Sequence, residues 1–245
     1  MSNLNWCRKF IRGKHGIVVS FLYFFLLILA KSFGRMGDIF LSVILITCYV
    51  IYYYKKKITV RDKKNINYLS YILAIFLGIG IAFMHSFNSL IPMSPEAMKV
   101  FSNVKYDMFD YIYICLLCPI TEEIIYRGII FKSYINVSTV RKAIVLSAIL
   151  FSITHMNIWQ MSTTLITGGI LAYLYYIADN IKLPIIVHIT ISTCAVSGFI
   201  NTMYLNVHKH MGEYLSVFVI GTFGCLLTIA MLYIVKKCTI IMINN

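Results

Sequence analysis

Three charged residues stand close together inside an apolar stretch of the sequence. Glu122 and Glu123 are adjacent, and Arg127 follows Glu123 by four residues, so a helix would place Glu123 and Arg127 on one face. Ionisable side chains inside a membrane are costly, and they commonly mark functional sites. A structural ion pair between helices is the other interpretation of Glu123 and Arg127, and the sequence leaves both open.

Two histidines occur in later apolar stretches. His155 ends the stretch Phe151-Ser-Ile-Thr-His155, and His188 ends the stretch Pro184-Ile-Ile-Val-His188. Both side chains are too polar to face lipid, so we expect them to face the interior of a helix bundle together with the glutamates. The sequence shows no serine or cysteine nucleophile with an associated base, so a water molecule would be the nucleophile.

These residue types support two arrangements for the hydrolysis of an amide bond. In the first, a glutamate is the general base for a water that one histidine also holds, and the other histidine donates a hydrogen bond to the oxygen that becomes negative. In the second, a glutamate and both histidines bind a zinc ion and leave one position open for water. The residues alone do not choose between the two.

Composition indicates which elements must position these side chains. The chain has 245 residues, of which 60% are hydrophobic and only 13% are charged, whereas soluble domains carry about 25% charged residues. Each of eight apolar runs is near the length that crosses a bilayer. They cover about residues 16–31, 37–54, 69–86, 108–131, 142–157, 159–178, 183–203 and 214–235. We therefore predict an all-α, polytopic membrane protein of about eight transmembrane helices, with one integral-membrane domain over residues 1–245 and a motif core at about 108–203.

The distribution of basic residues predicts the orientation in the membrane. Most of the 22 lysines and arginines fall in the amino-terminal segment, in the connections that follow even-numbered runs and in the carboxyl-terminal tail. Because basic residues favour the cytoplasmic side, we expect a multi-pass protein of the cell membrane with both termini cytoplasmic. The net charge of +13 then reflects topology and attraction to anionic lipid, and no motif supports a nucleic-acid partner.

The remaining segments have structural interpretations. The basic amino-terminal segment resembles a signal peptide but lacks a small-x-small cleavage pattern, so we expect a retained first helix. The connection at about residues 87–107 is the longest and is predicted to lie outside. The seven cysteines imply no disulfide framework, and we expect the closely spaced Cys115 and Cys118 to pack as small hydrophobic residues. A bias toward Ile, Lys, Asn and Tyr indicates an AT-rich bacterial genome.

Three short motifs on separate apolar runs resemble those of a known family. In order, they are Pro119-x-x-Glu122-Glu123-x-x-x-Arg127-Gly128, Phe151-x-x-x-His155, and His188 preceded by Pro184. Together they resemble the CPBP family, the type II CAAX prenyl protease and bacteriocin-processing group, also called Abi proteins. The resemblance implies an eight-helix, CAAX-protease-like bundle with intramembrane endopeptidase activity.

The resemblance also implies a role for each matching residue. Glu122 would activate the water together with His155, His188 would stabilise the oxyanion, and Glu123 and Arg127 would support the geometry. The full set of supporting residues is predicted to be Glu123, Arg127, Phe151, Ser192 and Asn157. The family is often described as metalloproteases, although a metal-free mechanism has also been proposed for it. No metal is therefore assigned, and a zinc ion, if present, would be held by Glu122, His155 and His188.

The chain departs from the family pattern at one position. The family's third motif is His-x-x-x-Asn or an acidic equivalent, whereas the fourth residue after His188 is Ser192. Serine can donate a hydrogen bond but is shorter than asparagine, and the loss of one oxyanion donor can cost roughly 10²–10³ in rate. The departure bears on the efficiency of the activity rather than on its existence.

We therefore predict an intramembrane endopeptidase that cleaves a peptide, or a prenylated or membrane-associated protein, near the cytoplasmic face. Bacterial peptide maturation, signalling and bacteriocin immunity are the expected settings. The alternative is a non-catalytic membrane scaffold or immunity protein of the same fold that binds a peptide or protein partner. A proton-coupled transporter is disfavoured because the two halves show no inverted repeat. To bring His155 to the depth of Glu122, its helix must begin in the cytosol, before Ile144.

Overall fold

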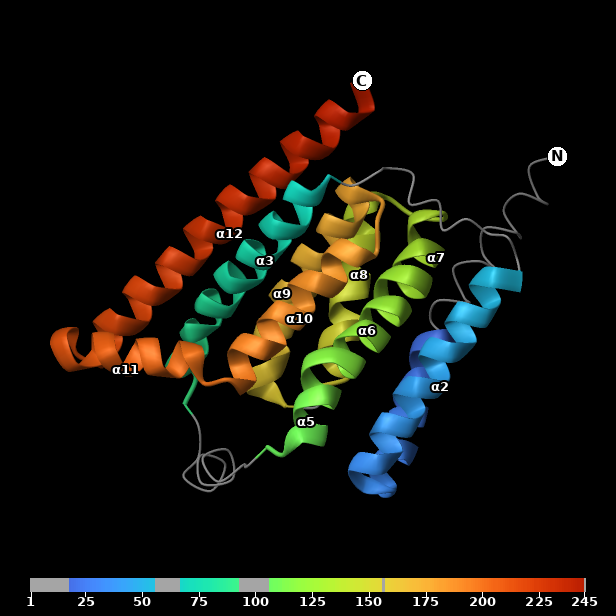
Figure 1. Ribbon diagram of the computed structural model, residues 1–245, viewed down its shortest axis with the longest axis horizontal. Coiled ribbons are helices and arrows are strands. Elements are labelled where there is room, and N and C mark those ends of the chain that lie inside the picture. The colour runs from blue at the N-terminus through green and yellow to red at the C-terminus, as the bar shows by residue number, and fades with distance from the viewer. Residues whose placement is uncertain (1–17, 56–66, 93–105, 156, 245) are drawn as a thin grey trace.

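The computed structural model describes residues 18–55, 67–92, 106–155 and 157–244, and every regular element within them is a helix. The long helices lie side by side as a bundle (Figure 1), which confirms the predicted all-α class. The elements are the helix Val18–Ser32, α2 (Gly34–Lys55), α3 (Tyr68–Met84), η1 (His85–Leu90), α5 (Met108–Ile112), η2 (Tyr113–Leu117), α6 (Cys118–Glu123), η3 (Ile124–Phe131), α7 (Lys132–Ile135), α8 (Val140–Ile153), α9 (Ile158–Ala178), α10 (Lys182–Val196), α11 (Phe199–Met211) and α12 (Glu213–Asn244).

Helices lie at all eight apolar runs, but fewer of them qualify as membrane spans. Among the described residues, four are long and apolar enough to cross a membrane: Gly34–Ile51, Tyr68–Leu90, Ile158–Ala178 and Glu213–Cys238. The pair α10 and α11 makes a fifth if the two count as one span, although a bend of 55° separates them. The predicted count of about eight spans is therefore not confirmed, whereas a helical membrane protein is supported.

Several predicted segments lie outside the described residues. These are the basic amino-terminal segment 1–17, residues 56–66 of the second connection and residues 93–105 of the third. The helix that leads to His155 is described, and it begins at Val140 behind the N-cap Thr139. Its start therefore precedes Ile144, as the depth argument requires, while the position of the membrane edge stays a prediction.

One continuous helical segment, from α5 to α7, carries both carboxylates. It begins behind Asp107, whose side chain accepts the Asp110 N–H while the Asp110 side chain accepts the Asp107 N–H. Two π-helical stretches, η2 and η3, flank α6. Pro119 has no N–H to donate to the preceding turn, and the wider π-helical turn immediately before α6 accommodates the missing bond. Such turns often occur at functional sites, and this one stands directly before Glu122 and Glu123.

Two glycines bring neighbouring helices unusually close to each other. Gly168 of α9 faces α8, where an added Cβ would lie 3.0 Å from the Phe151 ring. Gly78 of α3 faces α10, where an added Cβ would lie 2.8 Å from the Val187 carbonyl oxygen. Small residues permit such close packing between membrane helices. Of the two adjacent glycines in α9, Gly168 is the one that permits the close approach, since Gly169 faces open space.

Two apolar clusters form the core of the bundle. The first joins α3, α9 and α10, and its fully buried members include Leu77, Ile81, Leu171, Leu174, Leu183 and Val187. The second surrounds η3 and α8, and it includes Tyr126, Ile130, Phe131, Phe151 and Tyr175. His188 follows Val187 of the first cluster, and its ring lies 5.7 Å from the Phe151 ring of the second. The polar motif residues therefore gather where the two clusters meet.

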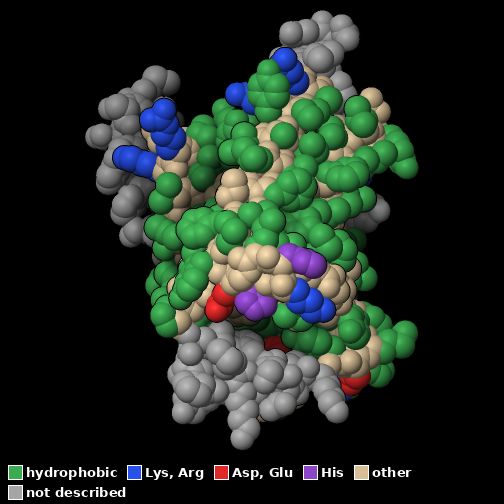
Figure 2. All heavy atoms as spheres, turned by 90° about the vertical axis from the view of Figure 1, so that its left-hand side faces the viewer, with side chains coloured by type: hydrophobic (Ala, Val, Ile, Leu, Met, Phe, Trp, Pro, Cys, Tyr) green, Lys and Arg blue, Asp and Glu red, His purple; other side chains and the backbone are tan. Residues whose placement is uncertain are grey.

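The outer surface is largely apolar, as expected for helices that contact lipid. Figure 2 shows this for the side of the molecule formed by α11 and α12, where the histidine side chains lie close together and the basic side chains form a few separate small groups. His208, Lys209 and His210 at the end of α11 are exposed. These two histidines therefore lie apart from the buried motif residues.

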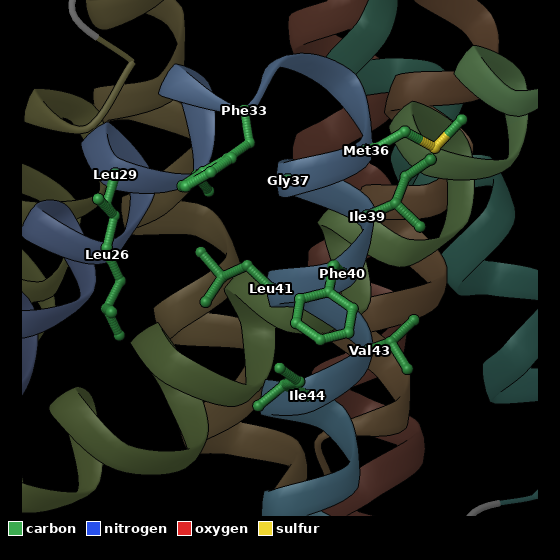
Figure 3. A pocket seen from close by; sticks show the side chains of 11 residues that line it. Leu26, Leu29, Phe33, Met36, Gly37, Ile39, Phe40, Leu41, Val43 and Ile44 are labelled. Atoms are coloured by element: carbon green, nitrogen blue, oxygen red, sulfur yellow. The ribbon is translucent and has the colours of Figure 1, made fainter.

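An apolar groove of about 770 Å³ lies between the helix Val18–Ser32 and α2. Figure 3 shows Leu26 and Leu29 on the first of these helices and Leu41 and Ile44 on α2. Every residue that lines the groove is apolar or glycine, and no predicted site residue is among them. The groove is therefore separate from the polar motif residues.

Candidate active site

Both carboxylates of the first motif are buried in the bundle. Glu123 is fully buried and Glu122 retains 7% of its exposure, and both lie in α6. Arg127, in the first turn of η3, is also fully buried. Because charges away from water need partners, the contacts of these three side chains decide what the site can do.

Arg127 connects three helices. Its Nη1 donates to Glu123 Oε1 at 2.8 Å, and its Nη2 donates to the Gly168 carbonyl oxygen at 3.2 Å. The guanidinium carbon also stands 4.7 Å from the centroid of the Phe151 ring, within the range of a cation–π interaction. The predicted pair of Glu123 and Arg127 is present, and it also fixes α8 and α9 against the helix of the carboxylates.

His188 contacts both glutamates, one with each ring nitrogen. Nδ1 donates to Glu123 Oε1 at 2.9 Å, and Nε2 lies 3.7 Å from Glu122 Oε2. One oxygen of Glu123 thus accepts from both Arg127 and His188. Glu123 accepts hydrogen bonds from two side chains and orients His188, whereas Glu122 lies near Nε2, on the other side of the same ring.

The charges of this cluster balance only with one further proton. Two carboxylates and one guanidinium leave one negative charge in a buried place, which is unfavourable. A proton on His188 Nε2 or on Glu122 removes this imbalance. The 3.7 Å between Nε2 and Oε2 is longer than a hydrogen bond. A water oxygen beside the pair can therefore contact both atoms at about 2.8 Å.

His155 joins this cluster through Phe151 rather than directly. Its Nδ1 donates to the Phe151 carbonyl oxygen at 3.1 Å, and its ring lies 5.0 Å from the Phe151 ring. Within the described part of the chain, no hydrogen bond joins His155 to Glu122. The Phe151 ring is therefore the common neighbour of His155, His188 and Arg127.

The other two predicted supporting residues lie at the edge of this arrangement. Ser192 is one turn after His188 in α10 and is half-buried, and it forms no hydrogen bond with any described residue. Asn157 is the N-cap of α9, and its side chain accepts the Trp159 N–H at 3.0 Å. Asn157 thus supports the start of the helix that carries Gly168, and among the described residues it forms no hydrogen bond with the carboxylates.

The structure adds two residues that sequence reasoning missed. His85 ends an apolar run but is half-buried rather than exposed at the surface. Its Nε2 lies 2.8 Å from Thr167 Oγ1, on the residue before Gly168. Tyr126 is fully buried, and its hydroxyl bonds Thr154 beside His155. Neither position carried a sequence signal, because each depends on a contact between distant helices.

The three predicted metal ligands were tested for their fit to a zinc ion. Among the described residues, no three His, Cys, Asp or Glu side chains are grouped so that they could hold a metal. His155 is turned to the Phe151 carbonyl, and His188 is bound to Glu123 by Nδ1. In this arrangement Glu122, His155 and His188 do not form a metal site.

The fold and this cluster define a class of protein: a helical membrane protein with a buried glutamate, histidine and arginine cluster suited to activating water. The sequence model of the family described as type II CAAX prenyl endopeptidase Rce1-like matches residues 104–194, a segment that contains every predicted site residue. This match confirms the resemblance predicted from the motifs. The family is one of proteases, which supports a peptidase with a peptide substrate in a lipid environment. No curated protein and no solved structure matches the chain.

Proposed function

We propose that the protein is an intramembrane endopeptidase in which Glu122 activates a water molecule beside His188. The observation that carries this proposal is the 3.7 Å approach of Glu122 Oε2 to His188 Nε2. Both side chains keep some exposure, 7% for Glu122 and 8% for His188, so water can reach them. Two groups that exchange protons with water are thus held together in surroundings that are otherwise apolar.

Hydrolysis follows from the placement of these two groups. Glu122 takes one proton from the water as the water oxygen attacks the carbonyl carbon of the peptide bond. The carbonyl oxygen becomes negative and accepts a hydrogen bond from the protonated Nε2 of His188. Glu122 then gives its proton to the leaving nitrogen, the C–N bond breaks, and an amine and a carboxylic acid are released.

The surrounding residues hold this geometry. Glu123 and Arg127 orient His188 through its Nδ1, and Arg127 rests on Phe151. Because Nδ1 of His155 is bonded to the Phe151 carbonyl, its Nε2 is left to accept a hydrogen bond from the same water. His155 has no direct bond to Glu122 among the described residues, so the water or the substrate connects them.

We further propose that the substrate is a peptide or a membrane-associated protein that is cut near the cytoplasmic face. Bacterial peptide maturation, signalling and bacteriocin immunity are the settings that suit such a reaction. The match to CAAX prenyl endopeptidases over residues 104–194 supports the substrate class, and the distribution of basic residues supports the side of the membrane.

The test uses the purified full chain in lipid nanodiscs and a library of fluorogenic peptides that includes prenylated carboxyl-terminal sequences. Glu122→Gln keeps the shape of the side chain but cannot accept the proton, so cleavage should fall roughly 10²–10⁴-fold. Glu213→Gln, at the exposed start of α12, is the matched control and should cleave like the wild type. Cleavage by Glu122→Gln at more than a tenth of the wild-type rate would contradict the mechanism.

A second candidate function is a non-catalytic scaffold or immunity protein that binds a peptide or protein partner. Two observations favour it: Ser192 forms no hydrogen bond with a described residue, and His155 does not contact Glu122 directly. This function predicts that Glu122→Gln leaves both partner binding and the cellular phenotype unchanged. A phenotype lost in Glu122→Gln but kept in Glu213→Gln would exclude it.

A further inference from the structure

A buried tyrosine links the helix of the carboxylates to the helix end that carries His155. Tyr126 is fully buried in η3, four residues after Glu122, and its hydroxyl donates to Thr154 Oγ1 at 3.1 Å. Thr154 is the C-cap of α8, and His155 is the next residue. Within the described part of the chain, Thr154 is the hydrogen-bond partner of the Tyr126 hydroxyl.

The donors and acceptors around Thr154 form one consistent chain. The Thr154 hydroxyl gives its only hydrogen to the Phe151 carbonyl oxygen at 2.8 Å, so it can only accept from Tyr126. The Phe151 carbonyl also accepts His155 Nδ1–H at 3.1 Å, which uses its second lone pair. The tautomer and orientation of His155 therefore depend on a carbonyl that Thr154 and Tyr126 help to hold in place.

The position of His155 makes such a link necessary. Regular hydrogen bonding of α8 ends at Ile153, and the last residues of a helix fray easily. Tyr126 contacts α8 at two levels, because its carbonyl also accepts from Ser147 Oγ at 3.2 Å. The hydroxyl contact is the one that reaches past the end of the helix to the turn of His155.

We propose that Tyr126 is a positioning residue that fixes His155 relative to Glu122 through Thr154. The inference rests on the proposed endopeptidase function and adds to it Tyr126, an uncharged residue at an unspecified position of the first motif. The Tyr126 side chain is closed off from solvent, so we expect its hydroxyl to act on turnover and not on substrate binding. A small displacement of a catalytic group can cost up to about 10²-fold in rate.

The experiment compares kcat and KM in variants that remove or keep single hydroxyl groups. Tyr126→Phe and Thr154→Val should each lower kcat about ten- to a hundred-fold with little change in KM. Thr154→Ser keeps the hydroxyl group and should have a kcat close to that of the wild type. The double variant should be no slower than Thr154→Val alone, because Tyr126 acts through the Thr154 hydroxyl that this change already removes. The matched control is Tyr134→Phe, since Tyr134 is also buried but its hydroxyl has no partner among the described residues.

A second measurement needs no activity. Amide hydrogen exchange over residues 151–157 should become faster in Tyr126→Phe and Thr154→Val, and it should stay unchanged in Tyr134→Phe. Wild-type kcat in Tyr126→Phe, an equal loss in Tyr134→Phe, or unchanged exchange would each overturn the inference. If Tyr126→Phe does not fold, the contrast between Thr154→Val and Thr154→Ser decides. Activity that survives Glu122→Gln while Tyr126→Phe is impaired would contradict the mechanism and leave the positioning role standing.

Discussion

Replacing Arg127 with methionine should strongly destabilise the protein, because it leaves the Glu123 carboxylate buried without its cation. Both side chains are fully buried. The change removes the 2.8 Å bond to Glu123, the 3.2 Å bond to the Gly168 carbonyl and the stacking on Phe151. Glu123 then keeps only His188 Nδ1. Breaking a buried ion pair by removing one partner costs about 3–5 kcal/mol of unfolding free energy.

Removing both charges together should cost much less. In the double variant Glu123→Gln with Arg127→Met, the glutamine oxygen still accepts His188 Nδ1–H, and no uncompensated charge stays in the core. Replacing a buried pair by neutral groups is often close to neutral. The double variant should therefore recover at least roughly 2 kcal/mol relative to Arg127→Met alone, which is a large departure from additivity.

The assay is reversible unfolding by SDS in mixed micelles, followed by tryptophan fluorescence and circular dichroism. Arg35→Met is the control, since Arg35 pairs with Asp107 and Asp110 at a partly exposed position and its loss should matter far less. A cost below about 1 kcal/mol for Arg127→Met would refute the reasoning. So would a double variant whose cost equals the sum of the two single changes.

Two further predictions follow from local geometry. Gly168→Ala should lower the unfolding free energy by about 1–3 kcal/mol and should also slow cleavage, because the added Cβ would meet α8 at 3.0 Å. The control is Gly169→Ala, because Gly169 faces open space. This control should be neutral or slightly stabilising in the SDS titration and should leave peptide cleavage unchanged. The backbone N–H of Asp110, and to a lesser degree Arg35, lowers the pKa of Asp107 below its ordinary 3.8. The contribution of ionised Asp107 to stability is therefore present above pH 3.8 and is lost as the pH falls through its folded-state pKa. Below pH 3.8, the thermal midpoint of the wild type should fall more steeply than that of Asp107→Asn, which keeps the cap but cannot titrate. Parallel pH curves would contradict this.

The helices could be predicted from sequence because each apolar run is itself the signal. The eight runs agree with helices in the structure, and apolar residues of these runs such as Leu77 and Val187 lie in the core. The number of membrane spans could not be predicted in the same way, because it depends on where a run bends. α10 and α11 read as one run, yet the chain turns by 55° between them at Gly198, which adopts a positive φ of 67°.

The candidate site was predictable in its members and only partly in its contacts. The spacing of Glu123 and Arg127 on one helix predicts their ion pair, because both partners share the same local frame. The contact of His188 with both glutamates, and the turn of His155 toward Phe151, depend on how α10 and α8 rotate against α6. The hydroxyl of Tyr126 is the extreme case, since its single partner lies on another helix and no pattern distinguishes it from other aromatic residues.

The two adjacent glutamates illustrate why the division of labour is a property of the fold. Successive residues on a helix point about 100° apart, so only one of them can face Arg127 and His188 Nδ1 together. That one is Glu123, whose Oε1 accepts from both and whose side chain is fully buried. Glu122 accepts neither of these two bonds; it is slightly exposed and lies 3.7 Å from the other nitrogen of the same ring. A carboxylate that already accepts two charge-assisted bonds is a poor base, whereas one without them is free to take a proton from water. Glu123 therefore orients His188, whereas Glu122, the same residue type at the adjacent position, is available to act as the general base.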